Sequence, residues 1–235
     1  MLSAIVVAAG SSSRMGFDKL FARLDGQPVL WHSLAAFGSC AEVAEVVLVA
    51  REERFAELER MAARTLGGKP FRCVRGGAER HLSVWEGLGA LRSEEAAYVA
   101  IHDGARPLIT PQAIRGCLGI AQRVGASCCA SRVPDTVKRA GADGVVFESV
   151  DRTGLWAMQT PQIFEKRLIR AAYEEVLRRG EVVTDEISAV QEMGVRAELF
   201  ENPDWNFKIT FPADLEKAAQ VLRWRREDSG GEKPV

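Results

Sequence analysis

The sequence lacks three features that would place the protein at a membrane or on nucleic acid. It has no apolar run long enough to span a bilayer, and the apolar stretch that opens the chain has no basic residue before Arg14. A large charge of one sign is also missing, because 31 Lys and Arg residues face 32 Asp and Glu residues. We therefore expect no membrane anchor and no targeting segment. We also expect no nucleic acid partner, since general nucleic-acid binding requires a basic surface.

The cysteines lack the pattern of a disulfide framework or a zinc site. Their number is odd and no C-x-x-C pair occurs among Cys40, Cys73, Cys117, Cys128 and Cys129. Buried thiols in a reducing compartment are the simplest interpretation, and they predict a cytoplasmic location.

Common cofactor and nucleophile signatures are absent as well. The glycine- and serine-rich segment that follows the first apolar run lacks the Gly-Lys-Ser/Thr ending of a P-loop and the G-x-G-x-x-G spacing of a dinucleotide site. The serines at positions 11–13 lack the G-x-S-x-G elbow of a hydrolase. These absences argue against an NAD-dependent oxidoreductase and against a serine hydrolase. The histidines His32, His81 and His102 show no metal-ligand spacing, so direct chemistry is not expected of them.

The sequence is rich in apolar residues, and strand-like apolar runs alternate along it with amphipathic segments typical of helices. Hydrophobic residues make up 47% of the 235 residues, enough for a large core. Short runs rich in Val and Ile predict strands at Ser3–Ala8, Glu45–Ala50, Phe71–Val74, Ala96–Ile101 and Ala126–Val133. Amphipathic segments between them predict helices at Pro28–Phe37, Arg51–Leu66, Ala78–Arg92 and Pro111–Val124. This rhythm predicts an α/β fold with a Rossmann-like, mostly parallel sheet and helices on both faces.

The rhythm breaks at Pro134. Two short charged runs, Thr136–Ala140 and Val145–Val150, flank a turn at residues 141–144 and predict a β-hairpin. Their charges prevent both runs from facing the main core, so residues 134–158 are expected to form a protruding arm. Further elements are expected at Glu165–Arg179, Asp185–Met193, Val195–Phe200 and Ala213–Arg226, of which only the third is a strand. We expect a single domain over residues 1–228 and a frayed tail over residues 229–235.

Three unusual loops follow predicted strands, at residues 8–16, 76–80 and 102–107. The carboxyl ends of parallel strands share one edge of a sheet, and ligands bind at that edge. The first loop joins small residues and hydroxyls to Arg14 and then Lys19, which favours a phosphate site over a merely flexible connection.

In the other two loops, functional and ordinary structural roles compete. Asp103 is well placed to hold a divalent cation against phosphates, but a turn or capping role is about as plausible. Arg106 can grip a phosphate or form a surface ion pair. The pair Gly76-Gly77 permits close approach to a flat base or makes a plain turn, and Ser83 can hydrogen-bond that base or lie on a helix surface.

Seven segments, taken in order, resemble one enzyme family. They are A-A-G-S-S-S-R-M-G, G-G-A-E-R-H-L-S-V, H-D-G-A-R-P, V-P-D-T-V-K, V-D-R-T-G-L-W-A-M-Q-T-P-Q-I-F, T-D-E-I-S-A-V and N-F-K-I-T. The ordered set resembles the 2-C-methyl-D-erythritol 4-phosphate cytidylyltransferases of the non-mevalonate isoprenoid pathway, from about residue 3 to about residue 222. The resemblance implies CMP transfer from CTP to the sugar phosphate, Mg²⁺, and a homodimer in which the arm embraces the second subunit.

The resemblance also implies roles for single residues. It gives the catalytic set as Arg14, Lys19, Asp103 and Lys208, with Asp103 also at the metal. It implies nucleotide binding by Ala8, Ala9, Gly10, Ser11, Ser12, Gly76, Gly77, Ala78, Ser83 and Gly104. It implies methylerythritol phosphate binding by Arg106, Thr136, Arg152, Thr184 and Asp185, with Thr136 and Arg152 donated to the neighbouring subunit's site. A sister enzyme that uses ribitol 5-phosphate and a non-enzymatic nucleotide-sensing module are the alternatives.

Overall fold

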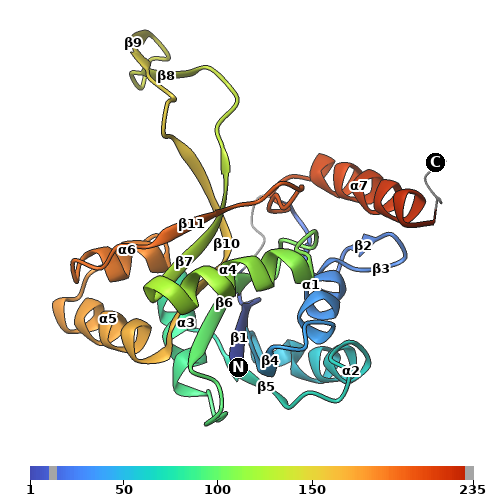
Figure 1. Cartoon of the computed structure of the whole chain (residues 1–235). Helices are drawn as coiled ribbons and strands as arrows, with labels where there is room; N and C mark the ends of the chain where they lie inside the picture. Colours follow the sequence, from blue (N-terminus) through green and yellow to red (C-terminus); the bar gives the residue numbers. More distant parts are fainter. Residues whose placement is uncertain (11–14, 231–235) are drawn as a thin grey trace, which may run out of the picture.

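A computed structural model describes residues 1–10 and 15–230 of the chain (Figure 1). The strands are β1 (Leu2–Val7), β2 (Arg23–Leu24), β3 (Gln27–Pro28), β4 (Val43–Ala50), β5 (Phe71–Arg75), β6 (Tyr98–Asp103), β7 (Ala126–Arg132), β8 (Val137–Ala140), β9 (Val146–Val150), β10 (Trp156–Glu165) and β11 (Glu198–Glu201). The helices are α1 (Val29–Gly38), the 3-10 turn η1 (Glu52–Arg54), α2 (Phe55–Thr65), α3 (Arg80–Gly89), α4 (Pro111–Val124), α5 (Lys166–Arg179), α6 (Glu186–Gln191) and α7 (Ala213–Gly230).

One seven-stranded sheet forms the centre of the molecule, in the order β11-β7-β10-β6-β1-β4-β5. The neighbours β6, β1, β4 and β5 run parallel, as do β11 and β7. Only β10 is antiparallel, to both β6 and β7. The predicted α/β fold with a mostly parallel sheet is therefore confirmed, and the sheet is mixed rather than purely parallel.

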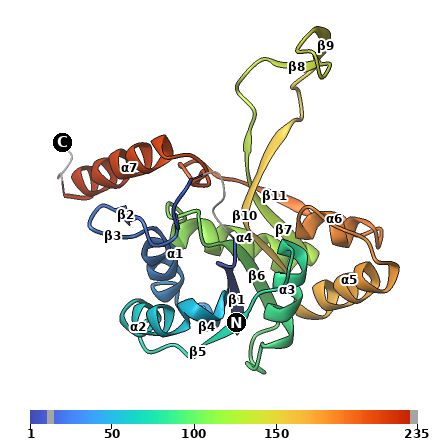
Figure 2. The same ribbon diagram turned by 180° about the vertical axis from the view of Figure 1, so that it is seen from behind.

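Helices cover both faces of the sheet because side chains alternate along its buried strands (Figures 1 and 2). Ala4 and Val6 of β1 face one cluster, which takes in apolar residues of α1, α2 and α4. Ile5 faces the opposite cluster, built with α3, α5 and α6. Because both faces are covered, these strands read as continuous apolar runs, and for that reason they were predicted to within a few residues.

Local signals also fix the helix ends. The hydroxyl oxygen of Thr110 accepts from the Ala113 N–H at 3.2 Å, Pro111 occupies the first turn, and Gly125 ends α4 in the left-handed conformation at φ 86°. α4 therefore has the predicted bounds.

Strand β10 was not predicted. Its sequence, WAMQTPQIFE, interrupts the apolar pattern with polar residues and carries Pro161, which ordinarily argues against an interior strand. The ladder to β7 is irregular between Met158 and Gln162, so Pro161 lies where regular pairing is suspended. The strand is nevertheless central, and its second half is buried.

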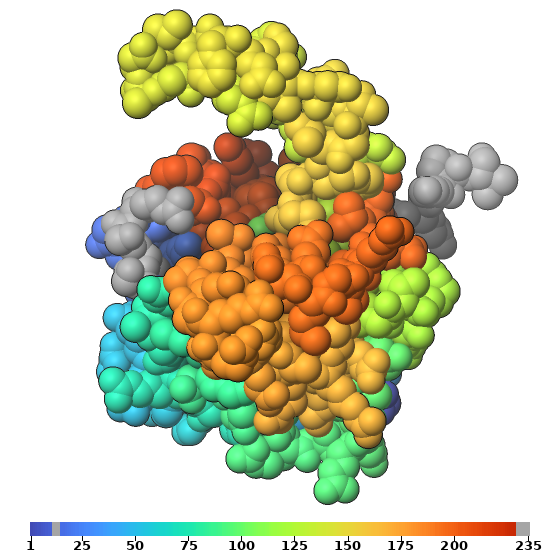
Figure 3. Space-filling model, turned by 90° about the vertical axis from the view of Figure 1, so that its left-hand side faces the viewer, coloured from blue at the N-terminus to red at the C-terminus, as the bar shows by residue number. Residues whose placement is uncertain are grey.

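The hairpin β8–β9 stands apart from the main sheet, as predicted (Figure 1). It lies at the end of an arm that leaves the sheet after β7 and returns into β10, and in Figure 3 the arm rises in yellow above the rest of the molecule. At its tip Val145, Val146 and Phe147 expose 62%, 57% and 66% of their surface. Within the described part of the chain, no other segment covers this apolar tip.

Three further expectations concern the C-terminal tail, the cysteines and the membrane. Helix α7 continues to Gly230, so the first two residues of the tail expected to be frayed belong to a helix, and residues 231–235 lie outside the described part. All five cysteines are free, and all but the half-buried Cys73 are buried. None of the helices described is both long and apolar enough to cross a membrane.

Candidate active site

A cavity of about 410 Å³ opens at the carboxyl ends of β1 and β6. Its walls bring together the segments after β1 and β6, the start of α3 and the segment before α7. The lining residues are Val7, Ala8, Ala9, Gly10, Met15, Lys19, Leu20, Gly77, Ala78, Glu79, Arg80, Ser83, Asp103, Ala105, Lys208 and Thr210. Most residues predicted for the catalytic and nucleotide-binding sets are among them. Ser11, Ser12 and Arg14 lie outside the described residues.

Gly76 and Gly104 lie beside the cavity and have packing roles. A Cβ atom on Gly76 would come within 2.4 Å of the Ala9 Cβ, so only glycine lets the first two loops approach this closely. A Cβ atom on Gly104 would come within 2.7 Å of the Leu30 Cδ1. The Gly104 N–H donates to the Val7 carbonyl at 3.0 Å, which ties the third loop to the end of β1.

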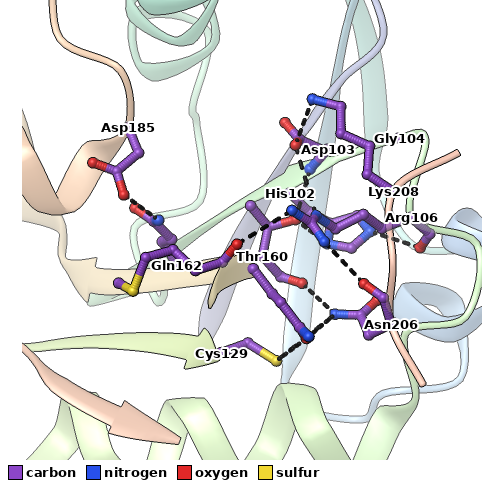
Figure 4. Close-up of polar contacts among 12 residues, drawn as sticks. His102, Asp103, Gly104, Arg106, Cys129, Thr160, Gln162, Asp185, Asn206 and Lys208 are labelled. Atoms are coloured by element: carbon purple, nitrogen blue, oxygen red, sulfur yellow. Dashed lines mark hydrogen bonds and ion pairs between the residues drawn. The ribbon is translucent and has the colours of Figure 1, made fainter. Parts of the chain in front are cut away.

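Asp103 is the buried anion at the centre of the site (Figure 4). Its Oδ1 accepts from Arg80 Nε at 3.1 Å and its Oδ2 accepts from Lys208 Nζ at 2.9 Å. Arg106 Nε is a third cation, 3.7 Å from Oδ2. Burial alone would raise the pKa of this carboxyl, but Arg80, Lys208 and Arg106 together hold it well below its usual range. Asp103 therefore carries its negative charge throughout the neutral range.

Arg80 and Glu186 are site residues that the sequence did not reveal. The fully buried Glu186 carboxylate accepts from Arg80 Nη1 at 2.6 Å and from Nη2 at 3.2 Å. It also accepts from the hydroxyl of Tyr173 at 3.1 Å. No local pattern connects Arg80 with a residue more than a hundred positions away, and a glutamate in an amphipathic segment is ordinarily placed on the surface.

Lys19 and Lys208 both bring positive charge to the lining. Lys19 Nζ donates to the Ile209 carbonyl at 2.8 Å, which directs it towards the segment that carries Lys208. That segment is fixed by the Ile209 N–H, which donates to the Ala105 carbonyl at 2.8 Å. The two ammonium groups and the Arg80 guanidinium suit the cavity to a polyanion such as a triphosphate.

A buried polar network supports Asp103 from below (Figure 4). The Asp103 N–H donates to Thr160 Oγ1 at 3.0 Å, and the Thr160 hydroxyl contacts His102 Nδ1 at 3.1 Å. Because the Arg106 carbonyl can only accept, His102 Nε2–H donates to it at 3.2 Å, and Nδ1 of the neutral ring accepts from the Thr160 hydroxyl. Burial lowers the pKa of His102 to about 4, so the ring stays neutral and has a structural role. Asn206 completes the network by donating to the Thr160 carbonyl at 2.8 Å.

The sequence profile of the family described as "IspD: 2-C-methyl-D-erythritol 4-phosphate cytidylyltransferase" matches residues 2–224, nearly the whole chain. The chain belongs to this family. It is therefore a nucleotidyltransferase, and its activity is that of a 2-C-methyl-D-erythritol 4-phosphate cytidylyltransferase of the non-mevalonate isoprenoid pathway.

Relatives and solved structures agree with this assignment. The 2-C-methyl-D-erythritol 4-phosphate cytidylyltransferase of Caldanaerobacter subterraneus subsp. tengcongensis is 38% identical over 225 residues, which cover 94% of this chain and 99% of the relative. That of Symbiobacterium thermophilum is 39% identical over 226 residues, covering 94% and 92%. The crystal structure of the 4-diphosphocytidyl-2C-methyl-D-erythritol synthase of Anaerococcus prevotii superposes with a TM-score of 0.83 at 29% identity, over 94% of this chain and 96% of that one.

In this cytidylyltransferase the Arg106 guanidinium is held by backbone carbonyls of two other segments. Its Nη1 donates to the Asn206 carbonyl at 2.9 Å (Figure 4). Its Nη2 donates to the Met158 carbonyl at 3.4 Å. The guanidinium is mostly buried and joins the third loop to the base of the arm and to the segment before α7. Arg106 is not among the described residues that line the cavity, and the phosphate-gripping role predicted for it stays a prediction.

Thr184 and Asp185, predicted to bind the methylerythritol group, lie at the start of α6. Asp185 Oδ1 accepts from the Ser188 N–H at 3.0 Å as the N-cap of this helix, and Oδ2 accepts from Gln162 Nε2 at 2.9 Å. Thr184 is exposed. Neither is among the described lining residues, so the structure gives Asp185 a capping role without testing the predicted one.

The arm residues Thr136 and Arg152 are exposed and do not line the cavity of their own chain within the described residues. Arg152 Nη1 donates to the Pro134 carbonyl, which keeps its guanidinium within the arm. Their predicted role at a neighbouring subunit's site therefore remains a prediction.

The donor set of the cavity fits a hard cation held mainly by phosphate. Among residues 1–10 and 15–230 no cluster of three or more His, Cys, Asp or Glu side chains is placed to hold a metal. Asp103, however, presents a buried ionised carboxylate in the lining. Protein Mg²⁺ sites beside nucleotides commonly use one or two carboxylates, with substrate phosphate and water as the other ligands. The site thus satisfies the protein's share of such coordination.

Proposed function

We propose that the cavity between the first and third loops is where this enzyme transfers CMP from CTP to 2-C-methyl-D-erythritol 4-phosphate, with release of pyrophosphate. The observation that carries the proposal is the charge arrangement around Asp103. Lys19, Arg80 and Lys208 converge on one cavity with a single buried carboxylate in its wall. This arrangement suits a reaction in which two anions must meet.

The chemistry asks for charge stabilisation more than for a base. A phosphate oxygen of methylerythritol phosphate attacks the α-phosphorus of CTP in line, and the bond to the departing pyrophosphate breaks. Because the nucleophile is already ionised, no strong general base is needed, and the protein's task is to neutralise the charge that develops on the phosphate oxygens. Lys19 and Lys208 are placed for that task, and we infer that Arg14 joins them.

The same proposal assigns the nucleotide and metal contacts. Backbone groups of residues 8–12 surround the triphosphate, and backbone groups of Gly77 and Ala78 with the Ser83 hydroxyl bind cytosine. Gly76 and Gly104 act by letting these loops approach each other. Asp103 would hold Mg²⁺, which supplies charge neutralisation on the triphosphate when bound. Lys208 Nζ contacts Asp103 Oδ2 at 2.9 Å and its side chain is 36% exposed, so it can turn towards the α-phosphate of a bound nucleotide.

The acceptor side needs a second chain. We infer a homodimer in which Thr136 and Arg152 of one arm reach the partner's cavity and meet the phosphate of methylerythritol phosphate. Thr184, Asp185 and Arg106 complete that side, Arg106 by fixing the base of the arm through the Met158 carbonyl. The exposed apolar tip of the arm supports a protein partner for it.

Pyrophosphate release by Lys19→Ala and Lys208→Ala tests the assignment of the cavity. Losing one such cation at a desolvated site costs on the order of 100-fold in turnover. Lys69→Ala is the matched control, because Lys69 Nζ also donates to a backbone carbonyl, that of Val43 at 2.9 Å, but does so outside the cavity. Near-native turnover in both cavity variants would remove the proposed site.

A panel of nucleotides crossed with polyol phosphates tests the substrates. We expect pyrophosphate release with CTP and methylerythritol phosphate in the presence of Mg²⁺, and much less with ribitol 5-phosphate. Faster turnover with ribitol 5-phosphate would favour the sister activity. CTP binding without pyrophosphate release from any pair would indicate a nucleotide sensor.

A further inference from the structure

The fully buried carboxylate of Glu186 lies beside the site but is not among the described residues that line the cavity. It is the first residue of α6, and its backbone is fixed on both sides. Gln162 of β10 donates to Asp185 Oδ2 at 2.9 Å and accepts from the Ile187 N–H at 3.0 Å (Figure 4). The side chain of Glu186 therefore projects from a rigid helix start.

All three nitrogens of Arg80 are engaged, and they face two different carboxylates. Nη1 and Nη2 meet Glu186, whereas Nε meets Asp103 Oδ1. Tyr173 donates its hydroxyl to the same Glu186 oxygen that accepts from Nη1. Burial raises the pKa of Tyr173 well above its usual range, so it remains a proton donor at every working pH.

We propose that Glu186, backed by Tyr173, is a positioning residue that holds the Arg80 guanidinium away from a two-pronged grip on Asp103. A guanidinium favours paired hydrogen bonds to a carboxylate, and Asp103 is within its reach. Because Glu186 takes both terminal nitrogens, Arg80 occupies one Asp103 oxygen only. The second oxygen remains for Lys208 at 2.9 Å, and for the metal inferred above.

This inference rests on the proposed function of Asp103 and Lys208, and it predicts a specific failure when Glu186 loses its charge. In Glu186→Gln the amide still accepts one hydrogen bond and fills the same space. The guanidinium is then drawn to Asp103, covers both oxygens and displaces Lys208. We expect kcat to fall about 10-fold, in the range seen when site geometry is disturbed from outside, while the KM for CTP stays within about 2-fold.

A double-variant cycle shows whether Glu186 acts through Arg80. In an Arg80→Gln background the guanidinium is gone, so Glu186→Gln should change kcat by less than about 2-fold. The double variant also restores the charge balance that Arg80→Gln disturbs, so it remains measurable where the single variant folds poorly. Tyr173→Phe provides a milder second perturbation, for which we expect a fall of about 3-fold in kcat that also disappears in the Arg80→Gln background.

Glu45→Gln is the matched control. Glu45 is likewise buried and pairs with an arginine, Arg72, at 3.0 Å, but it lies outside the cavity lining. Its loss should lower stability and leave kcat unchanged. Wild-type kcat in folded Glu186→Gln, or an equal fall with and without Arg80, would overturn the inference. Lys208→Ala distinguishes a failure of the proposed function from a failure of this inference. If Lys208→Ala abolishes turnover while Glu186→Gln leaves it unchanged, only the positioning role of Glu186 fails.

Discussion

The cavity and the arm handle charge in opposite ways. Around Asp103 the side chains are mostly buried, 10% exposed for Asp103 and 28% for Arg80, and each charge meets at least one opposite charge at short range. On the arm, the pair Arg139–Glu148 is 61% and 52% exposed, and apolar side chains at the tip face solvent. The charges around Asp103 are therefore paired within one chain, whereas the arm exposes both its ion pair and its apolar tip to solvent.

The largest expected effect comes from removing the charge at the centre of the cavity. Asp103→Asn leaves Arg80, Lys208 and Arg106 facing one another without their shared counter-ion. We expect a loss of about 3 kcal/mol in the free energy of unfolding, measured by urea denaturation, because the mostly buried Arg106 and the Lys208 ammonium lose their counter-ion while Arg80 keeps only Glu186. Asp143→Asn, in the turn at the tip of the arm, is the control and should cost well under half as much. Similar losses of unfolding free energy at both positions would show that the buried charges around Asp103 contribute no more to stability than an exposed turn residue of the arm.

Arg152→Ala should affect one substrate only. If the arm supplies this guanidinium to a partner's acceptor site, the KM for methylerythritol phosphate rises about 10-fold while the KM for CTP stays within about 2-fold. Steady-state pyrophosphate release with each substrate varied in turn measures both constants. An equal rise in the two would contradict the division between a nucleotide side within one chain and an acceptor side shared by two.

Phe147→Ser probes association separately from folding. The ring is 66% exposed in the single chain, so its loss should leave the unfolding free energy nearly unchanged. Burial of this ring against a partner would make the variant dimerise about 10-fold more weakly in sedimentation equilibrium. A wild-type chain that stays monomeric over the same concentrations would remove the dimer from the proposal.

The smallest effect is expected at Glu148→Gln. This substitution breaks an exposed cross-strand ion pair to Arg139 of 2.7 Å, and such pairs contribute about 0.5 kcal/mol or less. Thermal unfolding and turnover should both match wild type within error. A larger loss would mean that the arm is more ordered by its own charges than its exposure indicates.

The sequence predicted those parts of the fold whose signals are local. Buried parallel strands such as β1 and β4 have continuous apolar runs, and Thr110, Pro111 and Gly125 mark the ends of α4. β10 was missed because its stability comes from two flanking strands, and tertiary pairing overrides the polar residues and the proline in its sequence.

For the candidate site too, the position of the loops could be predicted from the sequence, whereas the side-chain contacts could not. The three loops that surround the cavity follow strand ends, so topology alone predicted that they converge. The ion pair of Arg80 with Glu186 could not be predicted from spacing, because the two residues come from opposite halves of the chain and meet only after α3 and α6 cover the same face. The contacts of Arg106 with backbone carbonyls of two other segments could likewise not be predicted, because Asn206 and Met158 lie far from it in the sequence.

The protected state of the thiols gives this enzyme a practical property. Cys40 is buried and Cys73 half-buried, and burial raises the pKa of each to about 11, while Cys117, Cys128 and Cys129 lie fully inside the core. Thiolate-directed reagents should therefore leave the native cysteines largely untouched at neutral pH. A cysteine placed at the 62% exposed Val145 would carry a fluorophore or spin label alone, so the position of the arm can be followed in solution without first removing the native cysteines.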